Sequence, residues 1–376
     1  MFSRAVYAVN WLNIGAIFFL MGPDLGGGVG GLAVITSSFY LGVGLMQVPS
    51  GILAARFGPK RVVSAGMLVS SSAAVLTSFG RTVPQVAALR FVVGGGMALV
   101  FAPGVVMVAA LLGGRRSGLA AGVFNSAYDF GGLFGLFAWV VVAESLGWRP
   151  SLVLSGALGI AGGVAVMLLA PQDDKRVDFT VKARTLARIL FNRELVLLGL
   201  GTLGFAVGNV VVSSLMEFYM ERDLGASPAL SGLVASAVVA APIFTAIWAG
   251  RRYDASGRPR LVLVASLTTG SAALALAALP SIYTALVCTT VVGVSSGIGY
   301  TFAFASARDL NPADGEYDTL AVSWVNGIQL TASFFPPVVF SFLAGVSGYP
   351  AAWIGTAALS FVFTVPLLMM REGPRR

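Results

Sequence analysis

The sequence predicts an all-α polytopic membrane protein, with twelve transmembrane helices in two pseudo-symmetric six-helix bundles. Three observations predict it: few charged residues, about twelve apolar runs of membrane-spanning length, and one basic motif that occurs twice. Apolar residues make up 57% of the 376 residues and charged residues 11%, whereas a typical soluble domain has roughly 25% charged residues. Because so few charges are not enough to cover a soluble globule, most of the exterior is expected to face lipid.

The apolar runs end at clusters of glycine, proline and charged residues. A bilayer core of about 30 Å requires about 20 residues of helix, and the runs are close to that length. In the first half they are 5–23, 31–54, 61–80, 84–112, 118–142 and 150–170. In the second half they are 193–220, 228–250, 261–279, 282–305, 317–343 and 349–370. Within 317–343, the pair Pro336 and Pro337 predicts a break in the helix.

A long hydrophilic stretch, residues 171–192, lies between the two sets of runs. It is expected to be a cytoplasmic linker joining an N-terminal bundle, residues 1–170, to a C-terminal bundle, residues 193–376. In its later part Leu186 and Ile189 alternate with basic residues, which predicts a short helix lying on the membrane surface.

The duplicated basic motif relates the two halves. The copy from Gly51 to Arg61 reads GILAARFGPKR, and the copy from Gly250 to Arg260 reads GRRYDASGRPR. Each has a second glycine seven positions after the first, followed by basic residues. Two related membrane halves are typical of transporters that expose a central site to each side of the membrane in turn.

Basic residues concentrate on one predicted side of the membrane. That side carries Arg4, the linker and the basic motifs, whereas the opposite side keeps Arg81, Arg149 and Arg222. The positive-inside rule therefore predicts a multi-pass protein of the cell membrane with both termini in the cytoplasm. The first apolar run lacks a clear cleavage site and is read as a membrane helix. Because the basic residues are spread over separate loops, nucleic acid is not expected as a partner.

Composition also excludes several kinds of chemistry. The chain has no histidine and one cysteine, Cys288, which excludes a disulfide framework and metal sites built from histidine and cysteine. The glycine runs 26–31 and 94–96 lack the strand–turn–helix context of a phosphate-binding loop. No cofactor is predicted. The absence of a nucleophile–base constellation argues against a membrane enzyme.

Three ionisable residues inside predicted spans are functional candidates, because a charge near the bilayer centre costs at least about 2.5–3.5 kcal/mol. Asp129 lies eleven residues into its run, about 16 Å deep and near the midplane, where a carboxyl group is a candidate proton carrier. Arg90 lies about 9 Å below the outer boundary and is a candidate anchor for an anion. Glu217, near the outer end of its run, is a second proton-coupling candidate. For each of them, a structural or solvated charge is the alternative.

Polar side chains at helical spacing suggest a lined cavity. Asn125, Tyr128, Asp129 and Gly132 share one face of the fifth predicted helix. Similar faces on other helices either bind substrate or form interhelical hydrogen bonds, worth about 0.6 kcal/mol each. The candidate substrate-binding residues are Arg90, Asn13, Asn125, Tyr128, Asn209, Tyr300, Asn326 and Gln329.

Together these elements resemble the major facilitator superfamily of secondary transporters. The motif after the second helix is similar to that family's motif A, and the residues from Arg90 through Gly94 and Gly96 are similar to its motif B. Gly147-Trp148-Arg149 is similar to another recurring element. The resemblance covers essentially the whole chain and implies the major facilitator fold, with helices 1, 4, 5, 7, 10 and 11 around a cavity.

The resemblance implies that the duplicated motif gates the cytoplasmic side. The gating residues are then Gly51, Arg56, Gly58, Lys60, Arg61, Gly250, Asp254, Gly257, Arg258 and Arg260. Two positions depart from the family pattern. Ala55 replaces the usual aspartate of the first copy, which implies a weaker first latch. Ala127 and Tyr128 replace the Gly-Pro of drug–proton antiporters, which disfavours antiport.

We therefore expect a monomeric secondary active transporter with rocker-switch alternating access. The favoured substrate is a small organic anion, taken up with protons carried by Asp129 and Glu217 and anchored by Arg90. The alternative is a proton-coupled exporter of lipophilic compounds, in which Arg90 controls the proton on Asp129. A sensor derived from a transporter is a third class. The expected partners are the substrate, protons and the lipid bilayer.

Overall fold

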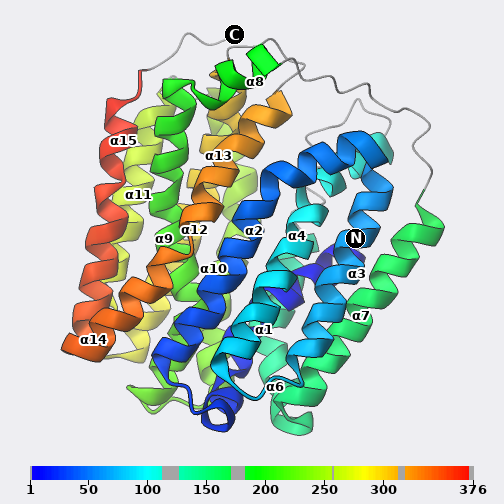
Figure 1. Ribbon diagram of the computed structural model, residues 1–376. Helices are drawn as coiled ribbons and strands as arrows, with labels where there is room; N and C mark the ends of the chain where they lie inside the picture. The colour runs from blue at the N-terminus through cyan, green and yellow to red at the C-terminus, as the bar shows by residue number, and fades with distance from the viewer. Residues whose placement is uncertain (1, 112–126, 171–182, 256–257, 312–317, 372–376) are drawn as a thin grey trace. The chain divides into compact units, whose positions relative to one another are not determined.

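The computed structural model describes residues 2–111, 127–170, 183–255, 258–311 and 318–371. These residues are overwhelmingly helical, and no strand occurs among them (Figure 1). Ten helices in the described part of the chain are long and apolar enough to cross a membrane. The all-α membrane fold class predicted from the sequence is confirmed.

The ten candidate spans correspond to the twelve predicted runs, because one span contains two runs and one run is not among the spans. Leu320–Met369, at 50 residues, is long enough for two crossings of about 20 residues each. The helix α3 (Pro59–Thr77), at 19 residues, matches the third predicted run without meeting the hydropathy of a candidate span. Within the described residues, the other helix limits agree with the predicted runs to within a few residues, and the predicted start at 118 lies outside them.

The chain divides into two compact units. Unit 1 takes in the described residues of 1–179 together with 213–236, and unit 2 takes in those of 180–212 and 237–376. The sequence-based halves coincide with these units apart from 213–236 and the stretch around 171–192. The assignment of 1–170, 171–192 and 193–376 as bundle, linker and bundle remains our proposal.

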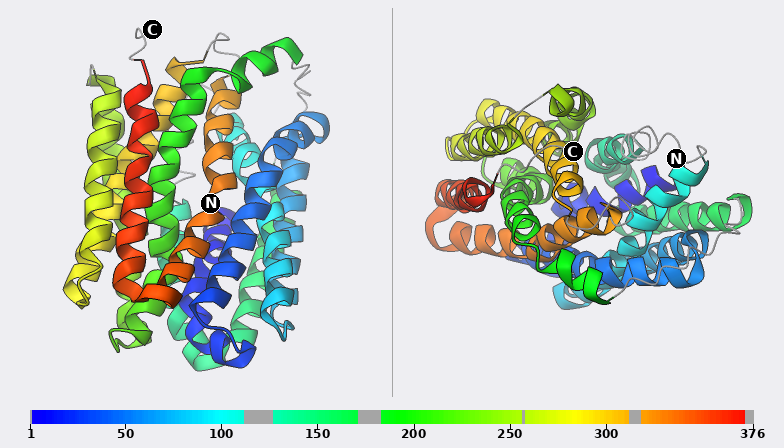
Figure 2. Two further views of the ribbon diagram at one scale, coloured as in Figure 1. Left: turned by 60° about the vertical axis from the view of Figure 1, so that its left-hand side comes forward. Right: turned by 90° about the horizontal axis from the view of Figure 1, so that it is seen from above.

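The first part of unit 1 is a bundle of helices. They are α1 (Phe2–Leu25), α2 (Val29–Phe57), α3 (Pro59–Thr77), α4 (Val83–Leu111), η1 (Phe134–Ala138), α6 (Trp139–Leu146) and α7 (Trp148–Leu169). The helical segment 127–133 runs into η1, a single π-helical turn, and then into α6 without a break. Both α2 and α3 pack on α4, and α3 also packs on α7 (Figures 1 and 2).

Glycines allow the closest of these contacts. A side chain at Gly94 of α4 would collide with the carbonyl oxygen of Phe39 on α2, and one at Gly42 of α2 would collide with that of Phe91 on α4. Small residues let membrane helices approach until their backbones touch. The α2–α4 pair is therefore fixed by backbone contact as well as by side-chain packing.

The remaining helices belong mainly to unit 2. They are α8 (Ala183–Leu190), α9 (Arg193–Arg222), α10 (Pro228–Ala255), α11 (Pro259–Leu276), α12 (Ile282–Asp309), α13 (Asp318–Ala332), α14 (Phe335–Val362) and α15 (Thr364–Met369). The end of α9 and the start of α10 lie in unit 1. The predicted short helix of the hydrophilic stretch is α8, whose Ile189 is buried in the core of unit 2. Cys288 of α12 is completely buried.

Three breaks separate consecutive helices. The predicted break at Pro336 and Pro337 is confirmed, because α13 ends at Ala332 and both prolines lie at the start of α14. Within α14, Gly348 has a φ of 80°, and Gly147 between α6 and α7 has a φ of 84°. Glycine adopts this left-handed conformation at no steric cost, so each position turns the chain sharply from one helix into the next.

The exterior carries the apolar surface expected of a membrane protein. Leu168, Leu169 and Phe244 are 71%, 82% and 76% exposed. Large contiguous apolar surfaces mark contact with lipid or with other proteins. In a chain with this many membrane-spanning helices, lipid is the partner that such a surface needs.

Candidate functional site

Arg90 is buried in the interior of unit 1, with 2% of its surface exposed. From α4 its guanidinium donates to α1, with Nη1 3.0 Å from the carbonyl oxygen of Asn10 and Nη2 3.5 Å from that of Trp11. The ring centre of Phe39 lies 4.6 Å from its Cζ. Its Nε has no hydrogen-bond partner, and no carboxylate of the described residues lies within 4 Å. Within the described part of the chain, the groups that contact this positive charge are therefore neutral.

A small cavity lies beside Arg90. Its volume is about 10 Å³, which is room for about one water molecule. The lining residues come from α1, α2, α4 and the unit 1 part of α9: Trp11, Leu12, Ile14, Gly15, Thr36, Phe39, Tyr40, Arg90, Ser213 and Ser214. The hydroxyl of Tyr40 accepts from the indole of Trp11 at 3.3 Å. Several hydroxyl groups thus share the cavity with one guanidinium, but an organic solute enters only if these helices separate.

Asp129 lies where the segment 127–133 packs on α1. A Cβ at Gly131 would collide with the backbone of Ala5, so the two helices are in direct contact. This contact brings Asp129, which is partly exposed, within electrostatic reach of Arg4. The predicted midplane carboxylate therefore has a positive counter-charge on α1.

Arg4 is a candidate that the sequence reasoning missed, because it was placed among the basic residues of the membrane surface. The structure buries it to 6% exposure. Its guanidinium lies 4.3 Å from the ring centre of Tyr7 and 4.7 Å from that of Tyr128. Guanidinium groups are attracted to the faces of such rings. The sequence pattern that could have identified Arg4 is its helical spacing from Tyr7 and Trp11, because the three residues share one face of α1.

Arg90 and Asp129 occupy different levels along α1. Arg90 contacts α1 at Asn10 and Trp11, whereas Asp129 interacts with Arg4, six residues earlier. Six residues correspond to about 9 Å along a helix. The two candidate residues therefore lie at different levels of unit 1 and do not form an ion pair with each other.

Two other candidates in unit 1 are buried. Asn13 donates to the hydroxyl of Ser155 on α7 at 3.2 Å, and its Oδ1 has no partner. Glu217 is 3% exposed, and neither of its carboxylate oxygens has a hydrogen-bond partner. A Cβ at Gly232 of α10 would lie 3.5 Å from Oε1 of this acid. Asn125 lies outside the described residues.

The candidates of unit 2 form a polar strip on α13 and an aromatic group on α12. Gln329 donates to the side-chain oxygen of Asn326 at 3.4 Å, and both residues are buried. Tyr300 stacks on Phe304 with ring centres 6.0 Å apart. Asn209 of α9 is partly buried. The Oε1 of Gln329 has no partner, so this strip retains an unused acceptor.

The two motif copies make the same contact in their own units. The ammonium of Lys60 donates to the carbonyl oxygen of Ala170, at the end of α7. The guanidinium of Arg260 donates to those of Leu368 at 3.4 Å and Met370 at 2.9 Å, at the end of α15. The copies are 199 residues apart, so Lys60 and Arg260 occupy adjacent positions of the motif and not the same one. Each copy therefore supplies a cation to the unpaired C-terminal carbonyls of the last helix of its half.

The rest of the motif is only partly described. Gly58, with a φ of 84°, ends α2 and turns the chain into α3, and Arg61 is exposed. The side chains of Arg56 and Asp254, and the whole of Gly257, lie outside the described part of the chain. The gating role of the motif remains a proposal.

The element at Gly147-Trp148-Arg149 ties together the ends of three helices. Arg149 donates to the carbonyl oxygens of Ser78 at 2.6 Å and Gly80 at 3.0 Å, after the end of α3. Trp148 donates to a carboxylate oxygen of Asp24 on α1 at 2.8 Å. This element therefore has a structural role at the end of unit 1 opposite the basic motif.

Comparison with known proteins agrees with this architecture. The model of the Major Facilitator Superfamily matches residues 1–217 and 198–376. The "Probable sulfoacetate transporter SauU" of Cupriavidus necator is 25% identical over 391 residues, which cover 96% of this chain and 91% of that protein. The "Probable actinorhodin transporter" of Streptomyces coelicolor is 29% identical over 153 residues, 40% of this chain and 26% of that protein.

A solved structure shows the same fold. The crystal structure of the nucleoside transporter NupG matches with a TM-score of 0.79 over 98% of each chain, at 12% sequence identity. The family model covers the chain from end to end. The family and the relatives named above are transporters, not enzymes. The chain belongs to the major facilitator superfamily and is a multi-pass membrane transporter.

Proposed function

We propose that this transporter takes up a small organic anion across the cell membrane together with protons, as a monomer with cytoplasmic termini. The observation that carries the proposal is the burial of Arg90 among neutral groups. Backbone carbonyls satisfy hydrogen bonds of its guanidinium but do not balance its charge. A buried charge without a counter-charge is costly, so this position favours an anion.

The chemistry of a guanidinium narrows the substrate class. Its planar donors bind two oxygens of a carboxylate, sulfonate or phosphate group at once. The hydroxyl groups of Tyr40 and Ser213 in the same cavity supply further polar contacts. The likeness to a sulfoacetate transporter supports an organic anion, since sulfoacetate bears a carboxylate and a sulfonate. Asn13, Tyr128 and the polar residues of unit 2 are proposed as additional contacts.

Proton coupling is assigned to Asp129, with Glu217 as a second acid. Asp129 is balanced by Arg4 when ionised, and this balance weakens when a proton neutralises the acid. The separation of Asp129 from Arg90 along α1 lets substrate and proton bind at different places in one unit. Glu217 is buried, and neither of its carboxylate oxygens has a hydrogen-bond partner.

Export of lipophilic compounds is the second candidate. The observation that favours it is the ring cluster of Tyr7, Trp11 and Tyr128, whose centres are 5.5 to 6.2 Å apart. Such a cluster of tilted and edge-on rings provides aromatic contacts for an aromatic substrate. The likeness to an actinorhodin transporter over 40% of this chain agrees with this candidate.

Thermal stabilisation of the purified protein separates the two candidates. A ligand at 100 times its Kd adds about 2.7 kcal/mol to the free energy of unfolding, which raises the Tm. We expect sulfoacetate and small dicarboxylates to raise the Tm, and lipophilic cations and aromatic drugs to leave it unchanged. If the lipophilic compounds alone raise the Tm, the proposal of anion uptake is wrong and export of lipophilic compounds takes its place.

Asp129→Asn is expected to remove proton-driven accumulation and to preserve exchange. The amide cannot carry a proton, but it keeps the shape of the side chain, so substrate should still bind. The measurement is uptake of radiolabelled sulfoacetate into proteoliposomes, with an inward proton gradient and, separately, with unlabelled substrate inside.

The matched variant is Glu217→Gln, which changes the second buried acid in the same way. If Asp129→Asn accumulates substrate like the wild type, Asp129 is not the proton carrier. If Glu217→Gln alone loses accumulation, the carrier is Glu217.

A further inference from the structure

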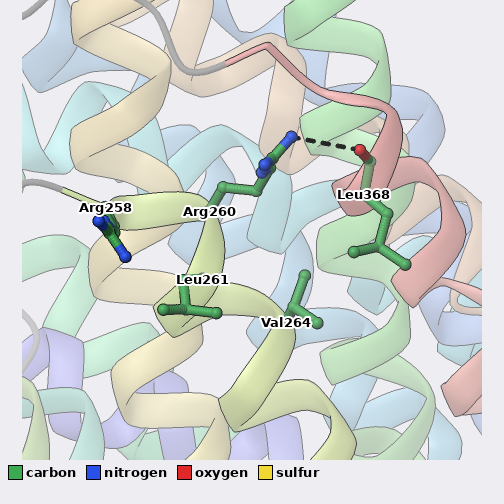
Figure 3. A pocket seen from close by; sticks show the side chains of 5 residues that line it. All are labelled: Arg258, Arg260, Leu261, Val264 and Leu368. Carbon is green, nitrogen blue, oxygen red and sulfur yellow. Dashed lines mark hydrogen bonds between the residues drawn. The ribbon is translucent and has the colours of Figure 1, made fainter.

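A second pocket lies in unit 2, where α11 begins and α15 ends. Its volume is about 330 Å³, at the lower end of the range for small-molecule sites. It is lined by Arg258, Arg260, Leu261, Val264 and Leu368 (Figure 3). No acidic residue belongs to this lining. The pocket therefore combines two cations with three aliphatic side chains.

The pocket lies at the level where the protein leaves the membrane. One candidate span begins at Pro259, between the two arginines, and another ends at Met369, beside Leu368. Residues at the end of a membrane span lie at the level of the lipid headgroups. Leu261 and Leu368 are each 57% exposed, as expected of side chains that face acyl chains. Headgroup and acyl chain are thus both within reach of the pocket.

The guanidinium of Arg260 is held in place. Figure 3 shows its side chain reaching the carbonyl oxygen of Leu368, and it also donates to that of Met370. Arg258 is the residue that precedes α11, and its side chain is exposed. Arg260 is therefore held by two backbone carbonyl oxygens, and Arg258 is exposed at the mouth of the pocket.

We propose that this pocket binds an anionic phospholipid, with the phosphate between Arg258 and Arg260 and an acyl chain along Leu261, Val264 and Leu368. Guanidinium groups suit phosphate because they bind two of its oxygens. Free phosphate would use the same two arginines, but it would leave the aliphatic wall unused. A lipid uses both halves of the pocket, and this site is separate from the proposed substrate position of unit 1.

Native mass spectrometry of the full-length protein tests the proposal. The protein is mixed with equal amounts of phosphatidylglycerol and phosphatidylcholine that have the same acyl chains. We expect phosphatidylglycerol to be retained preferentially. Arg258→Gln should reduce the preference about fivefold, because one arginine near an anionic membrane surface contributes about 1 kcal/mol to lipid binding.

The control variant is Arg252→Gln, which removes an exposed arginine of α10 that does not line the pocket. It should keep the wild-type preference, and both variants should keep the wild-type Tm. Equal retention of the two lipids by the wild type, or an equal loss in both variants, would overturn the proposal.

A competition experiment separates lipid from free phosphate. Excess inorganic phosphate should leave phosphatidylglycerol bound, whereas Leu261→Ser should weaken its retention by removing part of the aliphatic wall. If inorganic phosphate displaces the lipid and Leu261→Ser has no effect, the pocket is a site for free anions and the lipid assignment is wrong.

Discussion

Arg90→Gln is expected to weaken anion binding at least about 30-fold and to abolish uptake at low substrate concentration. The variant removes a buried cation from the position that favours an anion, and the loss of one partner of a buried charge pair costs about 2–5 kcal/mol. The measurement is the dependence of the Tm on sulfoacetate concentration for variant and wild type. Uptake into proteoliposomes then shows whether transport follows binding.

Arg90→Lys is the matched variant, because it keeps the charge but not the planar pair of donors. It should bind more weakly than the wild type and more tightly than Arg90→Gln. The hydrogen bonds from Arg90 to Asn10 and Trp11 also join α4 to α1, so the Tm without ligand must be compared as well. An unchanged affinity for anions in Arg90→Gln would contradict the proposed anchor, whatever the change in stability.

Gly94→Ala is expected to lower the free energy of unfolding by about 1–3 kcal/mol and to impair transport. The added methyl group would overlap the carbonyl oxygen of Phe39, and backbone cannot move aside as a side chain can, so α2 and α4 must separate. Phe39 lies against Arg90, so the separation also disturbs the proposed anion position. Thermal unfolding and uptake by the same preparation measure the two effects.

The neighbouring glycine provides the control. A Cβ at Gly95 would meet Cγ of Met46 at 3.5 Å, an ordinary contact, and alanine is intrinsically the better helix former by about 1 kcal/mol. Gly95→Ala should therefore be neutral or slightly stabilising. Equal losses in the two variants would mean that any added methyl group on this helix is harmful, and that backbone contact is not the cause.

The helices could be predicted well from the sequence, because the bilayer imposes their length and composition. The runs of apolar residues, the break at Pro336 and the short helix around Ile189 all depend on local composition. The turn at Gly348 was also visible as a gap between two runs. Local sequence was sufficient to predict those helices and breaks whose positions depend on contact with lipid or water.

The candidate site was less predictable because it depends on contacts between distant segments. Arg4 stands at the edge of its apolar run and is typical of a surface charge. Its guanidinium lies against the rings of Phe101 and Tyr128, which are far from it in the sequence. Likewise the contacts of Lys60 and Arg260 with backbone carbonyls depend on where α7 and α15 end, and the gating role of both residues stays a prediction.

The burial of Cys288 makes the native protein a nearly silent background for thiol chemistry. Its side chain is inaccessible in α12, and a buried, apolar thiol is inert toward reagents in water. A cysteine introduced at an exposed position would then carry a nitroxide or fluorophore alone, without prior removal of the natural residue. Opening and closing during a transport cycle can therefore be followed by spectroscopy on an otherwise unmodified chain.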